Sequence, residues 1–223
     1  MLAIESAFEL VACGERHALN RSAADLLSGA LKAVDREDHS AVTVQQHPLG
    51  FLCVKWNIDA SRSLRIHVWG QDMRYRQEPN WPIHDHIFSF KSVILLGKVQ
   101  NKIYTLSEQG KGRMCKIFEV DYTREQSTLI ATGDPAMLTM TSATVYEEGQ
   151  TYEMQSGILH RTALRSSFAV TVLATTLVRS QFGARPRVIG ATGGFGLAYN
   201  RRIAQKQEVL EQLESARKSL LIF

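Results

Sequence analysis

The sequence predicts an all-β fold with a helical segment at each end. Between residues 42 and 176, short runs rich in Val, Ile, Thr and aromatic residues are separated by Gly, Pro, Asn and Asp, the pattern of strands joined by turns. The two ends instead place apolar residues at helical spacing. Many short strands with turns between them are typical of an antiparallel sandwich or barrel, and not of a parallel α/β sheet.

We therefore expect three parts along the chain. The first is an N-terminal helical segment packed on the barrel (residues 1–41), the second is the barrel itself (42–180), and the third is a Gly- and Arg-bearing connector with a C-terminal helix (181–223). Residues 4–34 predict one or two helices, because their apolar positions recur at helical spacing: Leu26, Leu27, Ala30, Leu31 and Val34. Ten strands follow, at residues 51–56, 64–69, 83–87, 89–96, 100–106, 115–120, 136–140, 144–147, 156–162 and 169–176.

The C-terminal part begins after Arg179 with a glycine-containing connector and continues as a helix over residues 197–221. The connector holds Gly190, Gly193, Gly194 and Gly196, and the helix carries a narrow apolar stripe of Ile203, Leu210, Leu213 and Leu220. A stripe of this width packs either on the barrel or on another subunit, which leaves a homodimer open.

Composition excludes several classes of protein. The 223 residues are 44% hydrophobic and 22% charged, which excludes a disordered or fibrous chain. The net charge of +4 comes with scattered basic residues, so we expect no nucleic-acid partner, and no apolar run approaches the roughly 18 residues of a membrane span. Three distant cysteines without a C-x-x-C pair, and an N-terminus without the features of a signal peptide, predict free thiols and a cytoplasmic protein.

One group of residues predicts chemistry. His84 and His86 are two residues apart in a predicted strand, so their side chains share one face and could begin a metal site. His160 follows 74 residues after His86 in a second predicted strand, near Gly157, and would complete a set of three nitrogen ligands that leaves other coordination positions open. Taken by themselves, His84 and His86 also fit a chance pair of histidines on a solvent-exposed strand. His160 by itself also fits a buried histidine whose ring is hydrogen-bonded in the core.

The pattern resembles the cupin superfamily, whose motifs are H-x-H followed by a Gly, and G-x-x-H. The first is His84-Asp85-His86 with Gly97, and the second is Gly157 with His160. The closer resemblance, over roughly residues 51–176, is to the cysteine dioxygenase family of thiol dioxygenases. It rests on the stretch Ile66-His67-Val68-Trp69-Gly70, on Ile83-His84-Asp85-His86, and on Ser156-Gly157-Ile158-Leu159-His160-Arg161.

The resemblance implies a double-stranded β-helix, also called a jelly-roll barrel, in which His84, His86 and His160 hold a mononuclear Fe(II). In that family the substrate thiolate and amine occupy the open positions, and O2 adds to sulfur. Many other cupins add a glutamate ligand four or five residues after the second histidine, but Phe90 and Lys91 stand there in this chain.

Two features of the family are missing. Its Ser-His-Tyr relay would fall on the strand that here offers Thr171, Leu173 and Thr175, and its crosslinking cysteine is replaced by Lys91 or a neighbour.

The resemblance also points to further site residues. The family's carboxylate-binding basic residue has Lys55 as its nearest candidate, and Arg65, His67 and Trp69 share the pocket-facing side of their strand. Lys91 completes the substrate-binding candidates. His67, with an ordinary pKa of about 6.5, is a candidate general base, and Tyr146 and Tyr152 are candidate phenol donors. Each of these residues also fits a packing role with a satisfied polar group.

Three functions remain open from the sequence. The first is a mononuclear non-haem iron dioxygenase of the three-His type, acting on a small thiol- or carboxylate-bearing molecule with O2. The second is a Zn, Ni or Mn lyase, isomerase or hydrolase in which the metal is a Lewis acid. The third is a small-ligand-binding protein without enzymatic activity.

Overall fold

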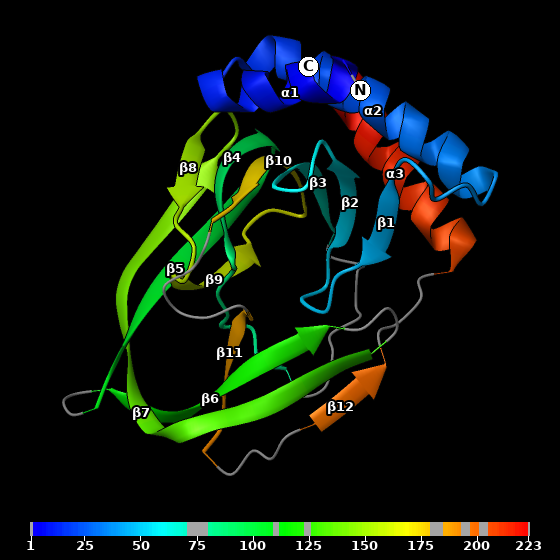
Figure 1. Cartoon of the computed structure of the whole chain (residues 1–223). Helices are drawn as coiled ribbons and strands as arrows, with labels where there is room; N and C mark the ends of the chain where they lie inside the picture. Colours follow the sequence, from blue (N-terminus) through cyan, green and yellow to red (C-terminus); the bar gives the residue numbers. More distant parts are fainter. Residues whose placement is uncertain are drawn as a thin grey trace.

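The computed structural model describes residues 2–70, 80–108, 112–122, 126–178, 185–192, 197–200 and 205–222 (Figure 1). Its helices are α1 (Leu2–Cys13), α2 (Arg16–Asp35) and α3 (Lys206–Leu221). Its strands are β1 (Thr43–Gln46), β2 (Leu52–Asn57), β3 (Arg62–Gly70), β4 (Phe88–Leu96), β5 (Lys98–Ser107), β6 (Arg113–Tyr122), β7 (Gln126–Glu147), β8 (Thr151–Met154), β9 (Leu159–Leu164), β10 (Phe168–Leu177), β11 (Arg187–Gly190) and β12 (Leu197–Asn200).

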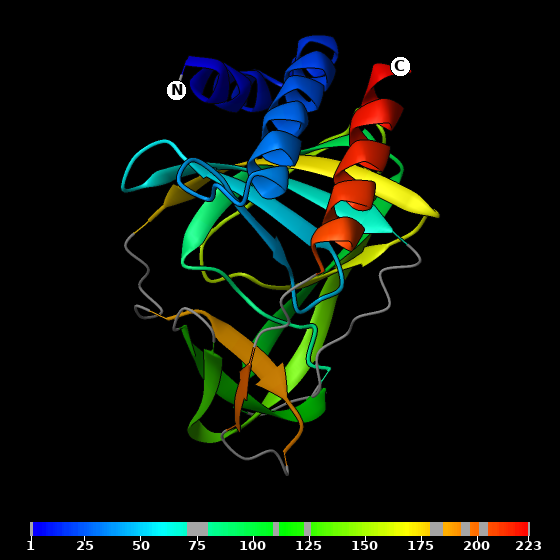
Figure 2. The same cartoon turned by 90° about the vertical axis from the view of Figure 1, so that its right-hand side faces the viewer.

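The three helices form a layer over one face of the barrel, and both chain ends lie in this layer (Figures 1 and 2). Val209, Leu213, Ala216 and Leu220 of α3 are buried in the same core cluster as the apolar face of α2 and the outer residues of the sheet beneath. Of the predicted apolar stripe, Leu213 and Leu220 are therefore buried within the chain and Leu210 is partly buried, whereas Ile203 lies outside the described residues. Among the described residues, no helix is long and apolar enough to cross a membrane.

The sheet beneath the helices has the strand order β1-β2-β3-β10-β4-β8, and all its neighbours are antiparallel. Side chains alternate between its two faces. Leu64, Ile66 and Val68 of β3 are fully buried in the cluster shared with the helices, whereas Arg65 and His67 between them line an internal cavity. Helix packing on the outer face thus fixes which residues face inward.

The second sheet has the order β11-β6-β7-β5-β9, with β12 beside β7. The two ends of this order are joined through one residue outside the named strands, because His84 bridges to His160 of β9 on one side and to Val188 of β11 on the other. The segment around His84 therefore closes the second sheet into a ring.

The connectivity is that of a jelly roll. Eight core strands can be numbered in chain order: β3, the His84 segment, β4, β5, β7, β8, β9 and β10. In the first sheet the first of these strands lies beside the eighth, the eighth beside the third, and the third beside the sixth (β3, β10, β4, β8). The second sheet pairs the second, seventh, fourth and fifth (the His84 segment, β9, β5, β7). Two antiparallel sheets linked in this way form the double Greek key of a cupin-type jelly roll, which confirms the predicted fold class.

Several predicted elements need correction. Residues 83–87 are not a strand, since only His84 among them makes a bridge to other strands. Pro82, which precedes this segment, has no N–H to donate. The predicted strands 136–140 and 144–147 belong to one strand, β7, which starts at Gln126. A Gly133-Asp134-Pro135 sequence is typical of a turn. In the structure these residues instead form a bulge within β7, opposite the register shift between Cys115 and Ile117 of β6.

Four short strands, β1, β8, β11 and β12, were not predicted, because four residues are too few to show alternation. In the predicted helix 197–221, residues 197–200 form β12 and helix α3 begins at Lys206. Gly190 lies in β11, while Gly193, Gly194 and Gly196 fall outside the described residues.

Candidate metal centre

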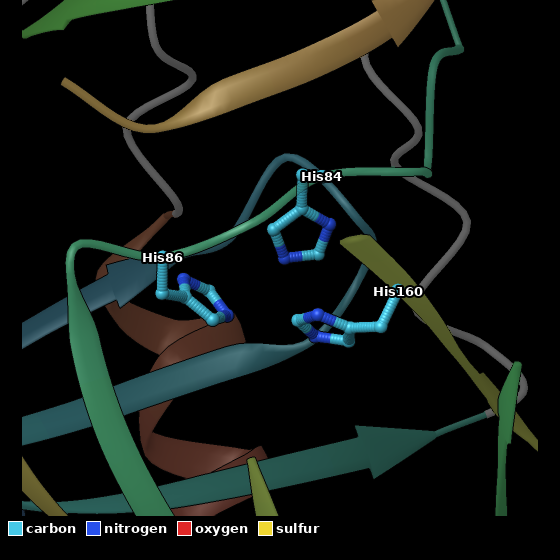
Figure 3. A group of neighbouring side chains, drawn as sticks. All are labelled: His84, His86 and His160. Carbon is cyan, nitrogen blue, oxygen red and sulfur yellow. The ribbon is translucent and has the colours of Figure 1, made fainter. Parts of the chain in front are cut away.

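His84, His86 and His160 lie together at the wall of the barrel, with their rings turned toward a common point (Figure 3). One ring nitrogen from each lies within 4.8 Å of the others. The ring centroids are 4.8 Å apart for His84 and His86, 4.6 Å for His84 and His160, and 5.0 Å for His86 and His160. Among the His, Cys, Asp and Glu side chains that the structure describes, these three form the group that could hold a metal ion.

Backbone hydrogen bonds set the positions of these residues. The His84 N–H donates to the His160 carbonyl at 3.0 Å, and the His160 N–H returns a bond to the His84 carbonyl at 2.8 Å. The His86 carbonyl accepts from the N–H of Gly157 at 2.9 Å, and Gly157 has φ +79°, which glycine adopts without strain. The two histidine motifs are therefore held directly against each other.

The orientation of two rings is fixed by backbone carbonyls. Nδ1 of His84 lies 3.1 Å from the Pro82 carbonyl oxygen, and Nδ1 of His160 lies 3.3 Å from that of Ile158. Because a carbonyl oxygen can only accept, each Nδ1 carries the proton and each Nε2 keeps its lone pair for a metal. His86 is held differently, by stacking on Phe88 with centroids 4.5 Å apart.

The electrostatics of the group favour neutral imidazoles, which are the form that binds metal. Burial lowers the pKa of His160 to about 3, and burial also lowers the pKa of His84. The pKa of His86 lies well below its usual range, first through burial and then through the neighbouring histidines.

Three neutral nitrogen donors fit a divalent transition metal. Metal–nitrogen bonds of about 2.1 Å place no two ligand nitrogens more than about 4.2 Å apart. Because the nitrogens of the three histidines are spread over up to 4.8 Å, we expect a metal ion to draw at least one imidazole inward.

Asp85 and Arg187 form a buried clasp behind the histidines. Arg187 Nε donates to Asp85 Oδ2 at 2.6 Å, the Arg187 backbone N–H binds Oδ1, and the Asp85 N–H donates back to the Arg187 carbonyl at 3.0 Å. Arg187 also donates to the Gly157 carbonyl at 3.0 Å. One guanidinium thus links β11, the His84–His86 segment and the turn before His160.

A cavity of about 570 Å³ extends from the three histidines along the inner face of β2 and β3. At the histidine end its wall is aromatic. The Phe51 ring stacks on the His47 ring with centroids 4.2 Å apart, and its centroid also lies 4.2 Å from that of Trp69. Trp69 Nε1 and Gln46 Nε2 are buried in this wall without a hydrogen-bond partner among the described residues.

The structure places Lys55, Arg65, His67 and Trp69 in the lining of this cavity. His67 contacts Phe51, with ring centroids 4.5 Å apart. Its pKa is about 3, lowered first by burial and then by the charge of Arg65. At neutral pH this imidazole is an uncharged hydrogen-bonding group and a weaker base than its ordinary pKa implied.

Two predicted site residues lie elsewhere. Lys91 lies on the helix side of β4, where its Nζ donates to the Ala12 carbonyl of α1 at 2.8 Å. Tyr146 packs in the core against Tyr152, with centroids 4.7 Å apart, and is not part of the cavity lining. Strand alternation puts Lys91 on the opposite side of β4 from Phe90, which lines the cavity, and the sequence alone could not tell which face was inside. Tyr146 packs inward from β7, but the cavity does not extend to it.

One residue beside the candidate metal centre escaped the sequence analysis. Arg187 falls in the predicted Gly- and Arg-bearing connector, but its side chain pairs with Asp85, 102 positions earlier. Of the two candidate phenol donors, Tyr152 on β8 lines the cavity, and burial raises the pKa of its phenol.

Comparison with known proteins gives only distant likenesses. No family profile matches the chain, and no curated protein is similar to it in sequence. Among solved structures, it is similar to hydroxypropylphosphonic acid epoxidase from S. wedmorenis, with 8% identity and a TM-score of 0.37 over 60% of this chain and 54% of the other. A hydroquinone 1,2-dioxygenase, PnpCD, in complex with Cd²⁺ and 4-hydroxybenzonitrile gives 12% identity and a TM-score of 0.32 over 54% and 60%.

Pumpkin seed globulin gives 12% identity and a TM-score of 0.35 over 66% of this chain and 36% of its own. The chain thus spans less than two thirds of each of these three proteins.

Proposed function

We propose that the protein is a mononuclear metal enzyme, an Fe(II) dioxygenase of the three-His cupin type that acts on a small anionic molecule. The observation that carries this proposal is the convergence of three neutral imidazoles at the wall of a 570 Å³ cavity. The donor set consists of nitrogen alone within the described residues, so several coordination positions stay open for substrate and O2.

A bound Fe(II) would supply those open positions and the redox chemistry of oxygen insertion. The residues of the chain orient and enclose the reactants. The Pro82 and Ile158 carbonyls hold the His84 and His160 rings in place. Phe51 and Trp69 keep the histidine end of the cavity apolar, which limits the access of water. Lys55 and Arg65 place positive charge further along the cavity, which attracts an anionic substrate.

Oxygen uptake tests the reaction class. Protein loaded anaerobically with Fe(II) is mixed with cysteine, cysteamine or 3-mercaptopropionate, and O2 consumption is followed with an electrode. We expect uptake that disappears in the His86→Ala variant. No uptake with any of the three removes the thiol dioxygenase version, and turnover of a substrate without O2 selects the Lewis-acid lyase, isomerase or hydrolase instead.

A further inference from the structure

The three candidate metal ligands are not held in the same way. The rings of His84 and His160 each place Nδ1 against a backbone carbonyl oxygen, at 3.1 Å and 3.3 Å. The His86 ring makes no hydrogen bond with any residue that the structure describes, although its backbone carbonyl accepts from Gly157 and Ser156. Because a hydrogen bond is directional, it fixes the rotation of the first two rings and leaves that of His86 to packing.

Aromatic packing takes the place of a hydrogen bond at His86. The ring of Phe88, two residues further on, stacks on the His86 imidazole with centroids 4.5 Å apart and planes 19° from parallel. Phe90 adds an edge contact to the same imidazole, with centroids 5.7 Å apart. The guanidinium of Arg65 lies over the Phe88 ring, 4.2 Å from its centroid, and a cation in this position attracts the ring. The orientation of His86 therefore depends on where the Phe88 ring lies.

A bound metal ion requires one of the three ligands to move. The ligand nitrogens are spread over up to 4.8 Å, whereas two metal–nitrogen bonds of about 2.1 Å span at most about 4.2 Å. Drawing in His84 or His160 would pull its Nδ1 away from the carbonyl oxygen that it binds. A stacked ring can instead slide across the face of its neighbour, because stacked aromatic rings are also favourable when offset. Movement of His86 therefore costs the least.

These contacts give Phe88 a role in the metal centre. We propose that Phe88 is the positioning residue of His86, and that its ring holds the imidazole beside the other two ligands and lets it slide inward when a metal ion binds. Phe88 acts through His86 and touches no metal itself. The centre would then combine two ligands fixed by the backbone with one adjustable ligand. This role rests on the proposed function, because it needs a metal ion at the three histidines, whereas the stack itself does not.

Histidine NMR spectra of metal-free protein, kept in a chelator, test the stack. Protons above the face of a phenyl ring resonate upfield. We therefore expect the His86 ring protons to move downfield in Phe88→Leu and to stay near their native positions in Phe88→Tyr, which keeps the ring. When Zn²⁺ is added to the native chain, the His86 ring protons should shift as the imidazole slides. The Nδ1 protons of His84 and His160 should remain hydrogen-bonded.

Calorimetric titration with Zn²⁺ tests the effect on the metal centre. Phe88→Leu should weaken Zn²⁺ binding at least about tenfold, the usual cost of losing a group that orients a metal ligand, and Phe88→Tyr should stay within about threefold of the native chain. The matched control is Phe8→Leu. It removes a half-buried ring of α1 that also lies beneath an arginine, Arg62 at 5.7 Å, and it should change neither the His86 resonances nor Zn²⁺ affinity.

The outcomes separate this inference from the proposed function. Unchanged His86 resonances or unchanged Zn²⁺ affinity in folded Phe88→Leu would overturn the role of Phe88 while leaving the metal centre in place. Loss of the Nδ1 hydrogen bond of His84 or His160 on Zn²⁺ binding would overturn the choice of His86 as the adjustable ligand. No Zn²⁺ binding by the native chain would overturn the metal centre, and the proposed function with it.

Discussion

Asp85 stands between two candidate metal ligands in the chain, and its carboxylate is bound to Arg187. Replacing Asp85 by Asn keeps its shape but removes the charge that balances a largely buried guanidinium. Because that guanidinium also binds the turn before His160, we expect metal affinity to fall about 10- to 100-fold, the usual cost of losing a group that orients metal ligands. Zn²⁺ titration by calorimetry measures the change.

The control for this substitution is Asp121→Asn, which breaks the exposed pair with Arg185 at 3.1 Å and should leave metal affinity unchanged. Equal Zn²⁺ affinity in Asp85→Asn and the native chain would show that the clasp does not position the histidines.

His67 makes the metal-free fold sensitive to acid. Its pKa is about 3 in the folded protein, against about 6.5 when unfolded. Above pH 6.5 both states are neutral and His67 has no effect. As pH falls from 6.5 toward 3, the unfolded chain takes up a proton that the folded chain does not, so stability is lost.

We therefore expect His67→Gln to reduce the loss of unfolding free energy between pH 7 and pH 5 by about 2 kcal/mol. Urea unfolding of chelated protein at the two pH values measures this difference. Parallel losses in the variant and the native chain would mean that His67 is not buried as a neutral imidazole.

At the scale of elements, the turn between β4 and β5 depends on one glycine. Gly97 has φ +76°, and a Cβ there would clash with the Phe168 carbonyl oxygen. We expect Gly97→Ala to lower the free energy of unfolding by about 2 kcal/mol or more, because both strain and a backbone clash are introduced. Thermal and urea unfolding measure it.

Gly29→Ala is the matched control, since that glycine lies inside α2 with nothing within 4 Å of an added Cβ. This second change should stabilise the protein by about 0.5 to 1 kcal/mol. Equal effects at the two sites would contradict the role given to Gly97.

Sequence periodicity identified the elements that are long and regular. Both faces of β3, β4 and β10 are covered, and their long apolar runs were found close to their true bounds. The His84 segment was misassigned as a strand. Its two histidines nevertheless converge on His160, because bridges to β9 and β11 hold a segment that has no regular ladder of its own. That support comes from residues about 75 and 100 positions away, which local pattern cannot reveal.

The same limit explains the site residues. Alternation correctly placed Arg65, His67 and Trp69 on one side of β3. It could not tell which side of β4 faced the cavity, and Lys91 lies on the other side. Tyr146 packs inside the molecule against Tyr152, but the cavity does not reach it. The Asp85–Arg187 pair is a tertiary contact, and Arg187 belongs to no motif that could have linked it to Asp85.

At the scale of the whole molecule, the helices stabilise the barrel from the face opposite the cavity. Leu213 of α3 is fully buried in the cluster shared with α2 and the first sheet. We expect Leu213→Ala to cost about 2 to 4 kcal/mol of unfolding free energy, while Zn²⁺ affinity of the folded protein stays within about twofold. Leu221→Ala, at a position that is 57% exposed, should change neither quantity. A large loss of metal affinity in folded Leu213→Ala would show that the helical layer shapes the metal centre.

The central claim is that three histidines from two distant segments hold one metal ion. Metal content settles it most directly, measured by elemental analysis on protein purified without chelator and again after anaerobic Fe(II) reconstitution. The native chain should hold close to one ion per molecule, and the His84→Ala/His160→Ala variant should hold none while keeping its β-sheet circular dichroism. A native chain that binds no metal after reconstitution, or a folded variant that binds as much as the native chain, would contradict the assignment of this site.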